Sequence, residues 1–219
     1  MLVSSAMTAR NAAQKKRGYH HGDLGRALVA AAVELIRDRG PEAFTLREVA
    51  NAVGVTHGAA YRHFEDKTAL LAAVAEDGFR ALGAHVGRAV ASDPRGPRER
   101  LRSIATAYVE FAMDRPAHYR VMSGPRLNED GRFPSLEAAI DEAFAFVIEE
   151  IRRGQAEGVF RREPARDLAL GVWVMAHGYV ELVFRRRLKV KSPKVAVEYF
   201  EKLFTPYLDG LAPKPPRRA

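Results

Sequence analysis

Apolar residues recur along this chain every three or four positions, as they do on the buried face of a helix, and breaks rich in glycine, proline and polar residues separate the repeating segments. No alternating segment is long enough to form a sheet. The strongest internal break is Ser92–Pro97, and residues 126–133 form a second polar stretch. The pattern predicts an all-α protein of about nine helices.

Several polar residues stand where a helix should begin. Asp23, Thr45, Thr56 and Asp66 suit N-cap positions, and Gly54 can take the positive φ that ends a helix. The expected helices cover, in order, about 24–39, 46–53, 57–64, 67–90, 98–113, 116–122, 136–155, 164–186 and 193–211.

Residues 45–67 predict a helix-turn-helix unit, in which the second helix fits the major groove of DNA. Leu46, Val49 and Val53 bury one face of the first short helix. Ala59, Ala60 and Phe64 give the second a narrow apolar stripe, which leaves its polar residues outside. Those polar residues are Thr56, His57, Gly58, Tyr61, Arg62 and His63.

The same stretch resembles a known family. The residues that stand where TetR-type transcriptional regulators carry such residues are Phe44, Thr45, Leu46, Val49, Ala50, Gly54, Val55, Tyr61, His63, Phe64, Lys67, Leu70 and Leu71. A second resemblance, at Trp173, His177 and Gly178, is to the Trp-His-Gly signature of one subgroup of ligand-binding domains in that family. The resemblance implies three DNA-binding helices, a connecting fourth, and a larger helical domain for ligand binding and dimerisation.

The expected organisation has four parts. They are a flexible basic arm at 1–21, a helix-turn-helix DNA-binding domain at 22–67, a helical ligand-binding and dimerisation domain at 68–211, and a disordered tail at 212–219.

Charge and composition favour a soluble protein that binds nucleic acid. The formal net charge of +8 favours a polyanionic partner, and Lys15, Lys16 and Arg17 lie in the arm before the first acidic residue. The arm suits a solvated tail as well as a segment that enters a DNA groove. The chain has no cysteine, and no apolar run approaches the roughly 20 residues that span a bilayer. We therefore expect a cytoplasmic protein without a membrane partner.

The candidate DNA contacts divide into those that position the protein on the DNA backbone and those that read the base sequence. Thr45, Tyr61 and Lys67 are expected to contact phosphates, and the resemblance implies this role for Tyr61 and Lys67. Contacts with the edges of base pairs are expected from Thr56, His57 and Gly58, with Arg47, Arg62 and His63 nearby. Alternatives remain: Phe64 suits the core, His63 suits a surface or capping histidine, and Lys67 suits a solvated lysine.

The second half of the chain is rich in large aromatic and flexible side chains on predicted helices. Trp173 and His177 lie four positions apart and can line one pocket. Each candidate also suits a core position. His177 and Glu181 share a face but lack a third ligand, so we expect no metal and no cofactor. The candidate ligand contacts are Tyr108, Phe111, Tyr119, Met122, Phe144, Trp173, Met175 and His177.

The expected function is sequence-specific transcriptional regulation. One helix-turn-helix covers little DNA, so a homodimer with recognition helices roughly 34 Å or more apart would read a palindromic operator. The resemblance implies a repressor that a small-molecule effector releases. The alternative is a nonspecific or architectural DNA-binding protein. No GxSxG, HExxH or phosphate-binding glycine loop nominates a catalytic residue, so we expect no enzyme.

Overall fold

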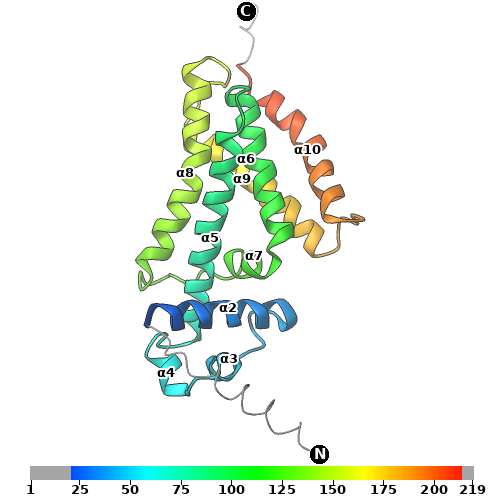
Figure 1. Ribbon diagram of the computed structural model, residues 1–219. Coiled ribbons are helices and arrows are strands. Elements are labelled where there is room, and N and C mark those ends of the chain that lie inside the picture. Colours follow the sequence, from blue (N-terminus) through cyan, green and yellow to red (C-terminus); the bar gives the residue numbers. More distant parts are fainter. Residues whose placement is uncertain (1–20, 214–219) are drawn as a thin grey trace, which may run out of the picture.

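The computed structural model describes residues 21–213, and within them the chain forms nine α-helices and no strand (Figure 1). The expectation of an all-α fold of about nine helices is confirmed. Most of the expected tail, from residue 214, and most of the expected arm lie outside the described residues. The helices are α2 (His21–Arg39), α3 (Leu46–Val53), α4 (His57–Tyr61), α5 (Lys67–Ala91), α6 (Pro97–Asp114), α7 (Pro116–Met122), α8 (Pro134–Ala156), α9 (Ala165–Phe184) and α10 (Pro193–Gly210).

Most helix boundaries follow the local signals. Thr45, Thr56 and Asp66 each accept a hydrogen bond from a backbone N–H in the first turn of the helix that follows, as N-caps do. The expected cap at Asp23 is wrong, because α2 already begins at His21. The helix expected to reach Phe64 ends at Tyr61, although irregular backbone hydrogen bonds continue as far as Phe64.

The helices divide into two groups, which we call the head (α2–α4) and the body (α5–α10). In Figure 1, α2 lies across one end of the long α5, with α3 and α4 beyond it. The other long helices of the body run away from the head, and α7 is wedged beside α2. The head therefore occupies one tip of the molecule.

The head does not close its core alone. Leu28, Ile36 and Val49 pack in one buried cluster with Leu70 of α5 and Val121 of α7. The expected boundary between 67 and 68 thus crosses a shared core. Because this core includes residues from both sides, movement of α5 or α7 strains the packing of the head.

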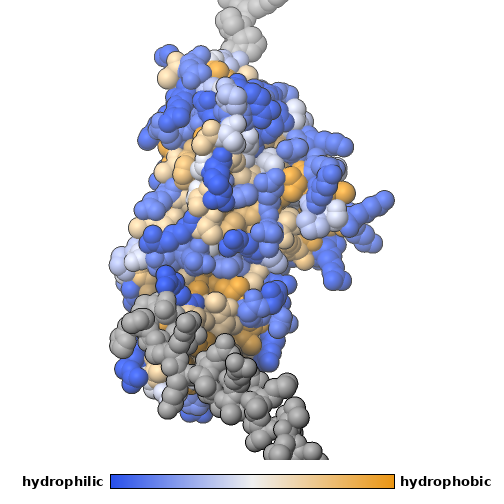
Figure 2. Space-filling view, viewed as in Figure 1, coloured by the Kyte–Doolittle hydropathy of each residue, from blue (hydrophilic) through white to orange (hydrophobic). Residues whose placement is uncertain are grey.

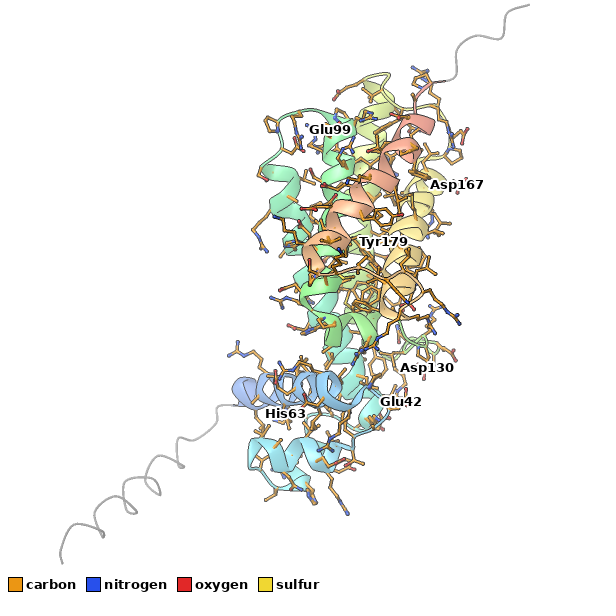
Figure 3. The ribbon with its side chains drawn as sticks, turned by 90° about the vertical axis from the view of Figure 1, so that its right-hand side faces the viewer. Glu42, His63, Glu99, Asp130, Asp167 and Tyr179 are labelled. Atoms are coloured by element: carbon orange, nitrogen blue, oxygen red, sulfur yellow. The ribbon has the colours of Figure 1, made fainter. Side chains whose placement is uncertain are left out.

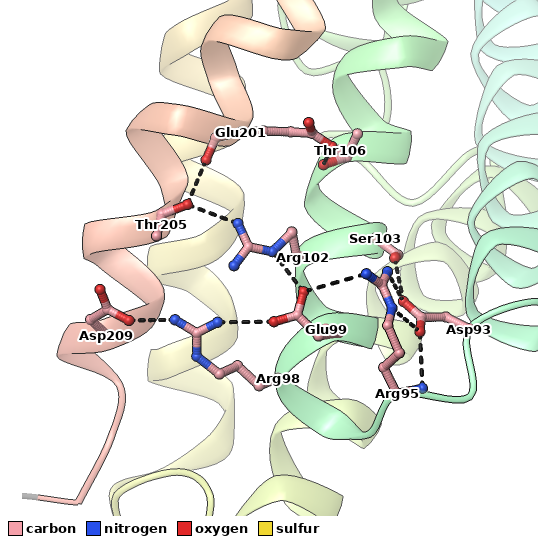
Figure 4. Close-up of polar contacts among 10 residues, drawn as sticks. All are labelled: Asp93, Arg95, Arg98, Glu99, Arg102, Ser103, Thr106, Glu201, Thr205 and Asp209. Carbon is pink, nitrogen blue, oxygen red and sulfur yellow. Dashed lines mark hydrogen bonds and ion pairs between the residues drawn. The ribbon is translucent and has the colours of Figure 1, made fainter.

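The body has its own core, and polar side chains fasten its far end. Arg102 of α6 donates to Thr205 of α10 at 2.8 Å, and Arg98 pairs with Asp209 (Figure 4). Arg100 donates to Glu150, which is almost fully buried, at 2.9 Å. These contacts hold α6, α8 and α10 together at the end opposite the head.

The helix α9 is unusually apolar. The mean hydropathy of its most apolar 18-residue window is 1.3, so by length and composition alone this helix could cross a membrane, although His177 and Glu181 interrupt its apolar residues. A core helix passes the same test. In Figure 2 apolar colour lies among the polar groups on the side of the body where α10 lies. The exposed large apolar residues of α9 and α10 are Leu170, Trp173, Val174, Leu182, Val195, Tyr199 and Leu203.

Candidate nucleic-acid interface and ligand cavity

The start of α3 is fixed by a capping box. The Thr45 hydroxyl accepts from the Glu48 N–H at 3.3 Å and donates to the Glu48 carboxylate at 3.0 Å, and the Thr45 N–H donates to that carboxylate at 2.8 Å. These hydrogen bonds lower the pKa of Glu48. Arg47 lies exposed in the same turn. The first turn of α3 therefore presents Thr45 and Arg47 from a rigid frame.

The turn between α3 and α4 depends on one glycine. Gly54 has a φ of 76°, a left-handed conformation that glycine adopts without strain. His57 then bonds Asn51, Nε2 to Oδ1, at 3.3 Å across the turn. The partly buried ring of His57 thus joins the two helices in the free protein.

The short α4 exposes one polar row. Ala60 is buried, while Thr56, Gly58, Tyr61 and Arg62 are exposed, Tyr61 by 51%. A Cβ added at Gly58 would meet nothing within 4 Å, so the helix surface is open there. With Arg47 and Thr45, these residues form the surface that we call the head face. It carries hydrogen-bond donors suited to phosphate oxygens and base edges.

Two of the expected DNA contacts point elsewhere. His63 is partly buried against α2, where its Nδ1 would lie 3.6 Å from a Cβ added at Gly25 (Figure 3). Lys67 Nζ donates to the carbonyl of Glu42 at 2.9 Å and lies 4.6 Å from the centre of the Phe44 ring. Both residues have structural roles in the free protein, and DNA contact by either stays a prediction.

A cavity of about 400 Å³ lies inside the body, within the size range of small-molecule sites. Helices α5 to α9 contribute to its wall, and no Asp, Glu, Lys or Arg of residues 21–213 lines it. Five expected ligand contacts belong to the lining: Tyr108, Met122, Phe144, Trp173 and His177. The sequence analysis missed the other wall residues, which are Phe79, Leu82, Val86, Ile104, Ala105, Ser123, Gly124, Ile140, Ala143, Val147, Leu170, Val172 and Ala176.

Three expected ligand contacts do not line the cavity. Phe111 is buried in the body core, and Met175 packs against that core. Met175 follows Trp173 by two positions, which turns it about 200° around the helix and away from the wall. Tyr119 is buried behind His177 rather than at the surface of the cavity.

The polar end of the cavity is built around one imidazole. The hydroxyls of Tyr108 and Tyr119 lie 3.2 and 3.0 Å from His177 Nδ1. Trp173 stacks on the His177 ring with the centroids 5.1 Å apart. Burial raises the pKa of Tyr108 to about 12 and raises that of Tyr119 as well. Both hydroxyls are therefore protonated at neutral pH. A Cβ added at Gly178 would meet nothing within 4 Å, so this glycine is not needed for close helix packing.

Two helices join the cavity to the head. Phe79, Leu82 and Val86 of α5 line the cavity, while the first residue of that helix, Lys67, contacts the head. The last residue of α7, Met122, lines the cavity one position after Val121, which lies in the head core. A change in the shape of the cavity can therefore reach α2–α4 through a single helix, either α5 or α7.

Comparison with known proteins identifies the family. Residues 28–74 match the sequence model described as "Bacterial regulatory proteins, tetR family", and residues 101–205 match the tetracyclin repressor-like C-terminal domain. The chain belongs to the TetR family. The Trp-His-Gly subgroup is not confirmed by these matches and stays a prediction.

Two relatives of this TetR-family chain are transcriptional repressors. It is 31% identical over 144 residues to the HTH-type transcriptional repressor Rv3405c of Mycobacterium tuberculosis, covering 62% of this chain and 67% of the repressor. It is 26% identical over 143 residues to the HTH-type transcriptional repressor KstR2 of Mycolicibacterium smegmatis, covering 64% of this chain and 69% of KstR2. A solved structure from Rhodococcus sp. RHA1, of unknown function, aligns with a TM-score of 0.76 at 30% identity, covering 90% of this chain and 100% of that one.

Membership of the TetR family makes the chain a ligand-responsive, DNA-binding transcriptional regulator, and the helix-turn-helix expected at 45–67 is confirmed by α3, the Gly54 turn and α4. The family and the relatives are regulators and not enzymes. Which residues contact DNA or ligand stays a prediction.

Proposed function

We propose that this protein is a cytoplasmic repressor that binds a palindromic operator as a homodimer and leaves it when a small molecule fills the body cavity. The observation that carries the proposal is the head face, an exposed row of polar side chains on a rigid helix-turn-helix at one tip of the molecule. Tyr61 would position the head on phosphates, and Thr45 would do so by exchanging its hydrogen bonds to Glu48 for a phosphate. Thr56, His57 and Gly58 would approach base edges with Arg47 and Arg62.

The homodimer is supported by the exposed apolar side chains of α9 and α10. Val174 of α9 is 54% exposed, and Tyr199 of α10 is 42% exposed. Apolar residues gathered on neighbouring helices favour burial against another protein surface. A second copy of the same chain would bury them in a symmetric contact, with one head at each end of the operator.

Release is a shift between two populations. An effector in the cavity must bind the operator-competent and operator-incompetent forms with different affinities. The helices α5 and α7 carry this difference to the head. Arg132, in the loop after α7, adds a third connection through hydrogen bonds to Asp66 at 3.1 Å and Glu65 at 3.2 Å. Coupling of about 2 kcal/mol would change operator affinity roughly thirtyfold.

Selection of bound duplexes from a random pool tests the proposal. We expect one enriched sequence with two-fold symmetry, and light scattering should give the mass of two chains. Enrichment of no sequence, or of a single unpaired half-site by a monomer, would contradict it. Competition with unrelated DNA separates this outcome from charge-driven binding, which every sequence would share.

A further inference from the structure

The wall of the body cavity is almost entirely hydrocarbon, and its few polar groups gather at one end. Tyr108 and His177 touch there, and Trp173 stacks on His177. In the part of the chain that the structure describes, no side chain with a full charge lines the cavity. A ligand that fits must therefore be apolar over most of its surface and must satisfy this one polar end.

The hydrogen bonds at that end do not balance. Two hydroxyl protons, from Tyr108 and Tyr119, meet one nitrogen, His177 Nδ1, at 3.2 and 3.0 Å. A ring nitrogen has one lone pair at most to accept with. The Tyr119 hydroxyl also faces the Glu181 carboxylate, so its proton has a second acceptor inside the protein. The second acceptor of Tyr108 is the Tyr119 hydroxyl oxygen, because the Trp173 indole can donate but cannot accept.

Either protonation of the neutral imidazole leaves a donor at the cavity. If Nδ1 accepts, it takes one hydroxyl proton, and Nε2 carries a proton; among the described residues both hydrogen bonds of His177 are at Nδ1. If Nδ1 carries the proton, neither hydroxyl can donate to it, Nε2 becomes an acceptor, and Tyr108 can give its proton to the Tyr119 oxygen or to a ligand. A donor on a residue that lines the cavity is therefore available with either protonation, whereas a ring acceptor is available only with the second, so an acceptor on the ligand can be satisfied in both cases.

Charge narrows the ligand further. A carboxylate or phosphate placed here would lose its hydration without meeting a cation, since no Lys or Arg lines the wall. A cationic ligand would meet no carboxylate in the lining. The ligand that matches a hydrocarbon wall and a spare donor carries an uncharged acceptor.

From this geometry we infer that the effector is an uncharged, mainly hydrocarbon molecule whose polar group is a hydrogen-bond acceptor of the carbonyl type, held by His177 and Tyr108. The inference rests on the proposed function, in which this cavity binds the effector. It assigns the two residues as the specificity-determining contacts of the site.

Three matched probes test the inference on the full-length protein without DNA. Butyl phenyl ketone carries a neutral acceptor, pentylbenzene carries none, and para-butylbenzoate carries a charge. Calorimetric titration should show the ketone binding roughly fivefold tighter than the hydrocarbon, as one net hydrogen bond provides. The benzoate should bind on the order of 100-fold more weakly than the ketone. Fluorescence of Trp173, the only tryptophan of the chain, should report the binding at this site.

Two variants complete the test. Joint replacement Tyr108→Phe and His177→Phe should abolish the preference for the ketone while the hydrocarbon still binds. Tyr119→Phe, which removes a hydroxyl that does not line the cavity, should keep the preference. Equal or tighter binding of the benzoate by the wild type, equal binding of ketone and hydrocarbon, or no binding of the ketone would overturn the inference.

The proposed function fails by different results. If the ketone is preferred but never weakens operator binding, the ligand class stands and regulation by this cavity fails. If the benzoate is preferred while an operator is selected, repression stands and the ligand class fails.

Discussion

The head face and the body cavity are built by opposite means. The head face consists of exposed side chains, and local hydrogen bonds of the capping box and the Gly54 turn hold its backbone. The cavity consists of buried side chains drawn from helices far apart in the sequence, and packing holds it. One surface should therefore tolerate substitution without loss of stability, whereas the other should not.

This difference separates recognition from folding. Exposed substitutions away from caps and glycine turns typically change the free energy of unfolding by less than about 0.5 kcal/mol. Buried substitutions cost several times more, because a close-packed interior cannot absorb added volume. The protein can thus lose DNA binding while remaining folded, and lose stability while its head face stays intact.

The largest effect is expected on the head face. Joint replacement Tyr61→Ala and Arg62→Ala removes an exposed phenol and an exposed guanidinium from each half of a dimer, so two contacts are lost twice. We expect operator affinity to fall roughly 100-fold, from about 3 kcal/mol of lost contacts. A gel-shift titration measures it, and the thermal midpoint should stay unchanged.

The matched control removes a positive charge far from the head. Arg152→Ala, on an exposed position of α8, should leave operator affinity within about twofold of the wild type. An equal loss in both variants would mean that net charge, and not the head face, carries the binding.

A glycine in the body gives the next largest effect. A Cβ at Gly154 would lie 2.1 Å from Phe160 Cδ2, and Phe160 is only 2% exposed, so the ring has no room to move. Gly154→Ala should lower the free energy of unfolding by about 2 kcal/mol, measured in urea. The control is Gly83→Ala on α5, whose Cβ would find ordinary contacts at 3.9 Å; it should be neutral or stabilise by up to about 1 kcal/mol. A destabilised Gly83→Ala together with an unaffected Gly154→Ala would refute the packing account.

A buried carboxylate predicts how stability depends on pH. Hydrogen bonds from Arg95 and from Ser103 hold the pKa of Asp93 well below its ordinary 3.8. A lowered pKa in the folded state adds stability above pH 3.8, and this stability is lost as the pH falls through the folded pKa. Asp93→Asn should therefore cost about 1–2 kcal/mol near neutral pH, and the gap to the wild type should close in acid.

Urea unfolding at several pH values measures this gap. Asp114→Asn, at a carboxylate that is 82% exposed, serves as the control and should change stability by less than about 0.5 kcal/mol at any pH. A gap for Asp93→Asn that stays constant into acid would show that the charge of Asp93 does not supply the stability.

The smallest effect concerns Lys67, the first residue of α5, which joins the body to the head. Lys67 holds the Glu42 carbonyl and the Phe44 ring, yet the family pattern places it at a phosphate. Lys67→Gln should lower the free energy of unfolding by about 0.5–1 kcal/mol. If Lys67 also binds phosphate, the slope of log affinity against log salt should fall by about 1 for each head. An unchanged slope would restrict Lys67 to its structural role.

Local chemistry explains why the head was predictable from sequence. Thr45 with Glu48, Gly54 and Thr56 are signals that act within a few residues, and α3 and α4 begin where those signals stand. The contacts of His63 with α2 and of Lys67 with Glu42 were not predictable in this way, since they depend on how separate segments pack. Such long-range packing leaves no mark in the residues around it.

The cavity was predictable only in part for the same reason. Tyr108, Trp173 and His177 stand out because aromatic rings with polar atoms are rare on apolar helix faces. Phe111 and Met175 are also large side chains on apolar helix faces, but they pack in the core. Leu82 and Val86 line the cavity, although a helical repeat cannot distinguish a wall from a core. That distinction arises from five helices at once.

Leu170 and Trp173 lie on the border between two surfaces of α9, because both line the cavity and both are exposed, by 47% and 40%. In the proposed dimer, a substitution at either position would alter both the shape of the ligand cavity and the surface that meets the partner chain. After gene duplication, substitutions here that change the ligand specificity of one copy would also change which chains it pairs with. Sequence divergence at Leu170 and Trp173 would then prevent the two regulators from forming inactive heterodimers.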